Sequence, residues 1–98
     1  RSDPIPYRIQ LFQNYPNPFN PGTTIRFQLT ATSEIELAIF DALGGKVKTL
    51  LRGRRPPGEY QIRWDGMDDQ NRSVASGIYF YRLSAGSFVQ TRKMVLIR

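Results

Sequence analysis

Short runs in which apolar and polar residues alternate constrain the fold of this chain more than any other feature. Residues 24–29, 34–40 and 60–64 all follow this pattern. A period of two puts successive side chains on opposite faces of a β-strand, so each run predicts a strand with one buried face and one wet face. Turn-forming residues separate the runs at 41–45 and 55–58. We therefore expect a chain of strands and turns, with no helix of any length.

The pattern predicts seven short strands. They are expected near residues 8–12, 24–29, 34–40, 46–51, 59–64, 78–84 and 87–97. Seven strands in about 100 residues, with turns roughly every 8–12 residues, are typical of an immunoglobulin-like sandwich. The predicted fold is thus all-β, an antiparallel immunoglobulin-like sandwich. Residues 1–10 are expected to form a linker and the start of the first strand, and residues 11–98 the domain. Trp64 is the largest candidate for the core.

Two runs are apolar on both faces, at residues 78–83 and 94–97. The first predicts a central strand and the second a last strand of similar character. Strands that are buried on both faces have this composition, and so do strands whose outer face meets a partner. The pattern leaves both interpretations open.

Residues 11–22 interrupt the strand pattern. Pro16, Pro18 and Pro21 fall within this stretch. Proline lacks the N–H group that a sheet ladder needs, so a regular central strand is excluded here. We expect an extended edge segment that Tyr15 and Phe19 hold in place.

Positive charge gathers toward the C-terminal end of a chain whose net charge is +6. From Arg82 onward the chain contains four basic residues and no acidic one. Such an end can meet nucleic acid, anionic lipid or an acidic protein surface, or it can be a solvated strand face. No apolar run approaches the roughly 18–20 residues of a membrane-spanning helix, so no transmembrane segment is expected.

The chain has no histidine and no cysteine. The usual nucleophile systems, which pair serine or cysteine with histidine, cannot be built without them, and the common zinc ligands are missing. A domain of this size has one thin core and no room for a deep cleft as well. We therefore expect a module that is not an enzyme and has no catalytic residue.

One acidic turn offers oxygen ligands that calcium could use. Asp65, Asp68 and Asp69 lie close together in the sequence. The spacing departs from an EF-hand loop, because Met67 and Gln70 occupy a ligand position and the required glycine position. The alternative is a turn in which the aspartates accept hydrogen bonds from backbone N–H groups. No other cofactor is expected.

Two further ligand classes fit single features of the sequence. Tyr60, Trp64, Tyr79 and Tyr81 could form a sugar-stacking platform, although aromatic residues at strand spacing are more often part of a core. Basic residues interleave with aromatic ones near the C-terminal end, as on surfaces that bind single-stranded nucleic acid. No nucleic-acid motif accompanies them, so nucleic acid is not the expected partner.

Five blocks, in order, resemble a known family. They are LFQNYPNPFNPGTTIRF at 11–27, FDALGGKV at 40–47, PGEY at 57–60, ASGIYFYRL at 75–83 and QTRKMVLIR at 90–98. Together they are similar to the C-terminal sorting domain of type IX secretion, type A. The stretch at 64–73 instead resembles a longer turn of the immunoglobulin-like domain in flagellar hook-capping proteins, a structural relative.

The resemblance implies a delivery label. Such domains sit at the C-terminus of exported proteins of Bacteroidetes and related bacteria, after an N-terminal cargo domain in the same precursor. It also implies transit through the periplasm and recognition by the outer-membrane translocon and its shuttle protein. A sortase-like peptidase usually then removes the domain, and the cargo stays at the cell surface or is secreted.

The last strand is the predicted recognition element, because its alternating residues can give one face to the core and offer the other to a partner. An unpaired edge strand can also add to a partner's sheet through backbone hydrogen bonds. The predicted recognition residues are Arg92, Lys93, Met94, Val95, Leu96, Ile97 and Arg98. The residues of the supporting motifs are Tyr15, Pro16, Asn17, Pro18, Phe19, Gly58, Tyr60, Gly77, Tyr79, Tyr81, Arg82 and Leu83.

Two other classes of function stay open. One is a structural or assembly module, either of the hook-cap type or a spacer next to an enzyme. The other is an accessory module that binds sugar or calcium. A sorting label must lie at the extreme C-terminus of a large precursor, a spacer can lie anywhere, and a sugar module should expose a row of aromatic side chains.

Overall fold

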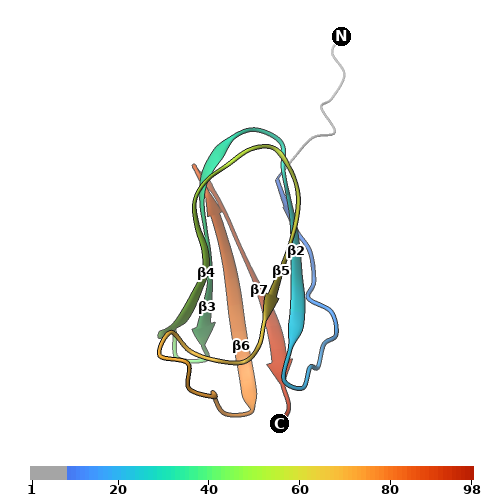
Figure 1. Ribbon diagram of the computed structural model, residues 1–98, viewed down its shortest axis with the longest axis vertical. Helices are drawn as coiled ribbons and strands as arrows, with labels where there is room; N and C mark the ends of the chain where they lie inside the picture. The colour runs from blue at the N-terminus through green and yellow to red at the C-terminus, as the bar shows by residue number, and fades with distance from the viewer. Residues whose placement is uncertain (1–8) are drawn as a thin grey trace.

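A computed structural model describes residues 9–98 (Figure 1). Of the linker predicted at residues 1–10, residues 1–8 lie outside this range. The strands are β1 (Gln10–Leu11), β2 (Thr23–Leu29), β3 (Ser33–Asp41), β4 (Lys46–Arg55), β5 (Gly58–Trp64), β6 (Gly77–Ala85) and β7 (Phe88–Leu96). They confirm the all-β prediction. The described range contains no helix, and hence none there that could cross a membrane.

The strands form two antiparallel sheets that face each other as a sandwich (Figure 1). One sheet has the strand order β1-β2-β5 and the other the order β4-β3-β6-β7. β6 lies inside its sheet, which confirms the predicted central strand, and β7 is an edge strand. The links from β2 to β3 and from β4 to β5 pass between the sheets at one end of the sandwich, and the C-terminus lies at the other end (Figure 1). We term this second end, with residues 13–22, 65–76 and 93–98, the C-terminal pole.

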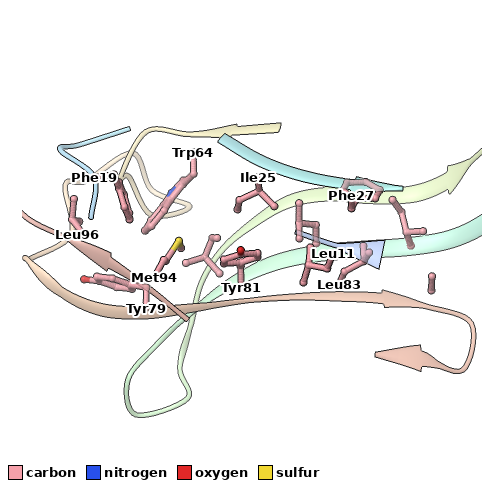
Figure 2. Close-up of a cluster of buried hydrophobic side chains, with 14 of the residues drawn as sticks. Leu11, Phe19, Ile25, Phe27, Trp64, Tyr79, Tyr81, Leu83, Met94 and Leu96 are labelled. Carbon is pink, nitrogen blue, oxygen red and sulfur yellow. The ribbon is translucent and has the colours of Figure 1, made fainter. Parts of the chain in front are cut away.

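The buried side chains of both sheets meet in one core (Figure 2). Every second side chain of β2 is buried, as the alternation predicts. Trp64 is fully buried, and its ring centroid lies 5.7 Å from that of Phe19 and 5.6 Å from that of Tyr79. Burying a side chain of this size contributes roughly 1.5–3 kcal/mol. The three rings therefore anchor the C-terminal pole.

β4 is longer than the sequence pattern predicts, because it ends at Arg55 and not near residue 51. The register between β3 and β4 shifts after Leu37 and again after Ile39. Each bulge adds a residue to one strand and interrupts the alternation of faces. Residues 47–51 are accordingly all half-buried, and no period of two marks this strand in the sequence.

Candidate functional site

The proline-rich segment lies against the outer edge of β7 at the C-terminal pole. The Phe19 N–H donates to the Val95 carbonyl at 3.0 Å, and the Ile97 N–H donates to the Phe19 carbonyl at 2.9 Å. The side-chain oxygen of Asn17 accepts a hydrogen bond from the Val95 N–H, also at 2.9 Å. Our expectation of an unpaired last strand is therefore wrong for residues 95–97, because their edge-facing backbone groups already pair within the chain.

The two aromatic residues expected to hold this segment behave differently. Phe19 is 2% exposed and packs in the core, as predicted, whereas Tyr15 is 80% exposed. The backbone of Tyr15 exchanges two hydrogen bonds with Thr24, at 3.0 and 2.9 Å. Tyr15 thus holds the segment through its backbone, and the expectation is wrong for its side chain.

Asn14 is the residue whose side chain points inward next to Tyr15, and the sequence pattern did not predict this. It is a buried polar residue, and its side-chain amide donates to the Thr23 hydroxyl at 3.0 Å. Its backbone N–H donates to the Tyr81 hydroxyl at 2.8 Å, and that hydroxyl donates to the Phe12 carbonyl at 2.7 Å. Burial raises the pKa of Tyr81 to about 12, so the hydroxyl remains a hydrogen-bond donor at a pH at which an exposed tyrosine would ionise. The sequence does not single it out, because Gln13, Asn17 and Asn20 are polar residues of the same segment.

The predicted recognition residues of β7 point to two sides. Met94 and Leu96 are buried in the core. Lys93 and Val95 alternate with them and point outward from the four-stranded sheet. Ile97, which follows the strand with the same orientation, is 50% exposed. The alternation divides the strand as the sequence predicts, and Lys93, Val95 and Ile97 are the side chains that a partner could reach.

The two predicted arginines fasten β7 to the rest of the molecule. Arg92 Nε donates to the Leu11 carbonyl at 2.7 Å and so joins the edges of the two sheets. Arg98 donates to two carbonyls of the loop at 65–76, to Val74 at 2.6 Å and to Gly66 at 2.7 Å. Planar guanidinium groups suit such paired contacts. Both side chains are engaged within the chain.

The remaining motif residues mainly shape the strands. Gly58 and Gly77 begin β5 and β6 with φ values of +147° and +155°, which glycine adopts far more readily than other residues. Leu83 is buried in the core, and Pro16 and Pro18 are exposed. Gly77, Pro16 and Pro18 lie at the C-terminal pole, whereas Gly58 lies at the opposite end of the sandwich.

The acidic turn after β5 uses its carboxylates to hold its own backbone. Asp65 accepts the Met67 N–H at 3.1 Å, and Asp68 accepts two backbone N–H groups at 2.9 Å, one of them from Arg72. The backbone hydrogen bond from Arg72 is the main reason that the pKa of Asp68 lies below its ordinary value. Within residues 9–98 no three acidic side chains gather as a metal site. Asp65 and Asp68 therefore match the capped-turn alternative. The calcium site at Asp65, Asp68 and Asp69 stays a prediction.

The same turn lies against the edge of β4. The Asp69 N–H donates to the Val47 carbonyl at 3.1 Å, and the Thr49 N–H donates to the Asp69 carboxylate at 3.4 Å. The turn thus covers the first half of this edge strand.

The proposed sugar platform is wrong for the aromatic residues that suggested it. Trp64, Tyr79 and Tyr81 are buried in the core. Tyr60 is half-buried, and its ring stacks on Phe27 with the centroids 5.0 Å apart and the planes 10° apart. The four aromatics stabilise the sandwich and offer no exposed row.

A family model decides the family of this chain. The model of the FlgD Ig-like domain matches residues 14–87. The chain belongs to the FlgD Ig-like domain family. The matched residues include the proline-rich segment from Asn14 onward, the acidic turn and β6, and they end before β7. A comparison with curated proteins gives no match.

Two solved structures contain a domain of the same fold. Dimeric latent PorU from Porphyromonas gingivalis matches with a TM-score of 0.72 and 19% sequence identity, over 91% of this chain and 9% of PorU. PorZ, described as an essential bacterial surface component of the type-IX secretion system of the same organism, matches with a TM-score of 0.58 and 22% identity. That match covers 90% of this chain and 11% of PorZ. This FlgD Ig-like domain therefore spans about a tenth of each protein that it resembles.

Proposed function

We propose that this FlgD Ig-like domain is a sorting domain of type IX secretion, one that directs an N-terminal cargo domain through the outer membrane. The observation that carries the proposal is the pairing of residues 17–19 with residues 95–97. These are the two sequence blocks that most resemble type A sorting domains. Two backbone–backbone hydrogen bonds join them across almost the whole sequence, and a third runs from the Val95 N–H to the Asn17 side chain. A label built from both ends of a domain can be read only when the domain is complete.

The comparisons support this proposal at the level of fold. PorZ is described as an essential surface component of the type-IX secretion system, and a domain within it has the fold of this chain. The proposal includes transit through the periplasm and a final place at the cell surface or outside the cell. Its partners are the translocon, its shuttle protein and a sortase-like peptidase.

We also propose that the domain is not an enzyme. The chain lacks histidine and cysteine, and its three aspartates after β5 hold backbone N–H groups. In this proposal the outward side chains of Lys93, Val95 and Ile97 serve recognition. They lie on a strand whose other face is fixed in the core, so their positions do not depend on the cargo.

A reporter fusion tests the sorting role. Residues 1–98 are fused to the C-terminus of a periplasmic fluorescent reporter, in a bacterium with a working type IX system. We expect reporter at the cell surface or in the medium, and its loss in a translocon mutant. A smaller exported product would report removal of the domain by a peptidase. The reporter without the domain is the control and should stay in the periplasm.

The family match favours a second function, that of a structural or assembly module. A fusion that remains folded in the periplasm of the strain with a working translocon would contradict the sorting role and leave this second function. Binding assays with calcium and with glycans would then test the accessory alternative.

A further inference from the structure

Exposed apolar side chains gather on one side of the molecule. Three of the five strongly exposed large hydrophobic residues within 9–98 lie on β6, on β7 or directly after β7. Ile78 (45% exposed) and Val89 (60%) point outward from β6 and β7, and Ile97 follows β7 with the same orientation. Leu43, 98% exposed, lies in the turn that joins β3 to β4. We term the outward surface of this sheet the four-stranded face. Ile78 lies opposite Val95 near one end of this face, and Val89 lies opposite Ser84 near the other end. Exposed apolar side chains on one face of a sheet are a feature of sites for a partner.

An aromatic pair lies at the centre of the four-stranded face. In the strand register, Phe40 of β3 lies opposite Phe80 of β6. Lys46 of β4 lies opposite Phe40, and Lys93 of β7 lies opposite Phe80. A row of two aromatic residues between two lysines therefore crosses all four strands. The Arg82 guanidinium lies 4.4 Å from the centroid of the Phe40 ring, where a cation–π contact holds it over the face.

A shallow hollow of about 240 Å³ lies beside the aromatic pair. Phe40, Phe80 and Arg82 line it, together with Thr91 and the turn after β3. Sites that enclose a small molecule are usually larger, about 300–1,000 Å³, and deeper. This hollow suits a single apolar side chain from the surface of a partner.

Two of the acidic side chains near this face are already engaged, and a third, Glu34, is exposed on β3 opposite Arg54. Glu36 accepts a hydrogen bond from Lys46 at 2.8 Å, which is the main cause that lowers the pKa of its carboxyl group. Asp41 accepts two backbone N–H groups of its own turn, at 3.0 and 2.8 Å. In the part of the chain that the structure describes, neither Arg82 nor Lys93 forms an ion pair. The charge that this face offers to a partner is positive.

We propose that the four-stranded face docks a folded protein whose contact surface carries apolar side chains surrounded by carboxylates. This inference rests on the proposed function. It names the chemistry of the partner that recognises β7, and it extends the recognition site from β7 over β6 and β3. Carboxylates complement Arg82 and Lys93, whereas a second copy of this chain would bring like charges together. On the other sheet, the outward side chains of β2 and β5 are all polar or charged, so that face has no apolar centre. These residues are Thr24, Arg26, Gln28, Glu59, Gln61 and Arg63.

Charge reversal in the reporter fusion tests this docking surface. The test variant is Arg82→Glu with Lys93→Glu, and the matched control is Arg26→Glu with Arg63→Glu on the other sheet. Arg26 is a close match for Arg82, because its guanidinium also lies over a phenylalanine ring, 4.6 Å from the centroid of Phe12. We expect the test variant to lower surface display about tenfold or more, and the control to change it less than about twofold.

A second pair of variants guards against a loss of folding. Ile78→Ser removes an exposed apolar side chain from the four-stranded face, and Gln61→Ser shortens an exposed side chain on the other sheet. Ile78→Ser should lower display severalfold and Gln61→Ser should not. The thermal unfolding midpoints of all four purified variants should stay within about 5 °C of the unchanged domain.

The outcomes separate this inference from the proposed function. If the unchanged fusion is not exported, the sorting role fails and the docking inference fails with it. If it is exported and both charge-reversed fusions are displayed equally, the docking inference alone is overturned. Two further results also overturn it. One is concentration-dependent dimerisation of the purified chain that Ile78→Ser abolishes, and the other is cosedimentation with phosphatidylglycerol vesicles that Arg82→Glu with Lys93→Glu abolishes.

Discussion

The four-stranded sheet has two edge strands, and the chain covers them in different ways. At β7 the cover is Phe19, which pairs with the strand through its backbone and buries its ring in the core. At β4 the cover is Asp69, which contributes one backbone hydrogen bond of 3.1 Å and one longer side-chain contact of 3.4 Å. Uncovered edges pair with other chains, so both covers protect the fold. The comparison indicates that the β7 cover should open only with the whole domain, whereas the β4 cover can open locally.

The largest effect should come from removing the apolar part of the β7 cover. Phe19→Ala deletes a buried ring that packs against Trp64, and a change of this kind costs about 3–5 kcal/mol. Urea unfolding of the purified chain measures the loss. Tyr15→Ala is the matched control in the same segment, because the exposed ring should contribute less than about 0.5 kcal/mol. Equal losses for the two variants would mean that the segment is held by its backbone alone.

A smaller effect should follow from removing one polar contact of the same cover. Asn17→Ala takes away the acceptor of the Val95 N–H, which should cost about 0.5–1.5 kcal/mol. Hydrogen exchange should show faster exchange at the Val95 amide and little change at Ile97, whose N–H still bonds to Phe19. Unchanged exchange at Val95 would contradict the assigned contact.

The β4 cover should depend on the arginine that holds its loop. Arg98→Gln removes the paired donation to Val74 and Gly66, so the loop at 65–76 should open more often. We expect the Asp69 amide to exchange severalfold faster while global stability falls by about 1 kcal/mol or less. Arg98→Lys is the control that keeps the charge but not the planar donor, and its exchange should also rise. Unaltered exchange in both variants would show that the clamp does not support the cover.

The smallest effect should be a pH dependence confined to the β4 cover. The pKa of Asp68 lies below its ordinary value of 3.8, mainly because of the Arg72 backbone hydrogen bond. The contact therefore stabilises the turn fully above that ordinary value, and the stabilisation is lost as the pH falls through the lowered pKa. The Arg72 amide shift in NMR spectra should follow this titration, and Asp68→Asn should abolish it. A titration above the ordinary value would contradict the assignment.

Strands such as β2 and β5 could be predicted from the sequence, because burial on one face leaves a period of two, whereas the bulged β4 lacks this period and extends beyond its predicted end. The covers could not. Alternation gives the orientation of each side chain but not the register between strands, and the row of Phe40 and Phe80 exists only through register. Within the proline-rich segment the local pattern indicated an extended chain. It could not decide that Phe19 turns inward and Tyr15 outward, since their backbone partners, Val95 and Thr24, belong to different strands.

For the acidic turn, the sequence fitted two structures and could not distinguish them. Its composition fitted both a cation site and a capped turn, because carboxylates accept backbone N–H groups as readily as they bind calcium. The hydrogen bonds of Asp65 and Asp68 to the backbone of their own turn show the cap, and spacing alone does not contain them.

The pairing of Phe19 with Val95 and Ile97 also has a consequence for how this domain folds during its synthesis. Phe19 leaves the ribosome among the first residues of the domain, and both of its partners leave among the last. Through nearly all of its synthesis the nascent chain therefore carries an aromatic ring without a pocket and a sheet without its final strand. Contacts between such distant parts of a sequence form slowly. Until these contacts form, the segment around Phe19 is available to a holding chaperone. The same segment later covers the edge of β7 in the folded domain.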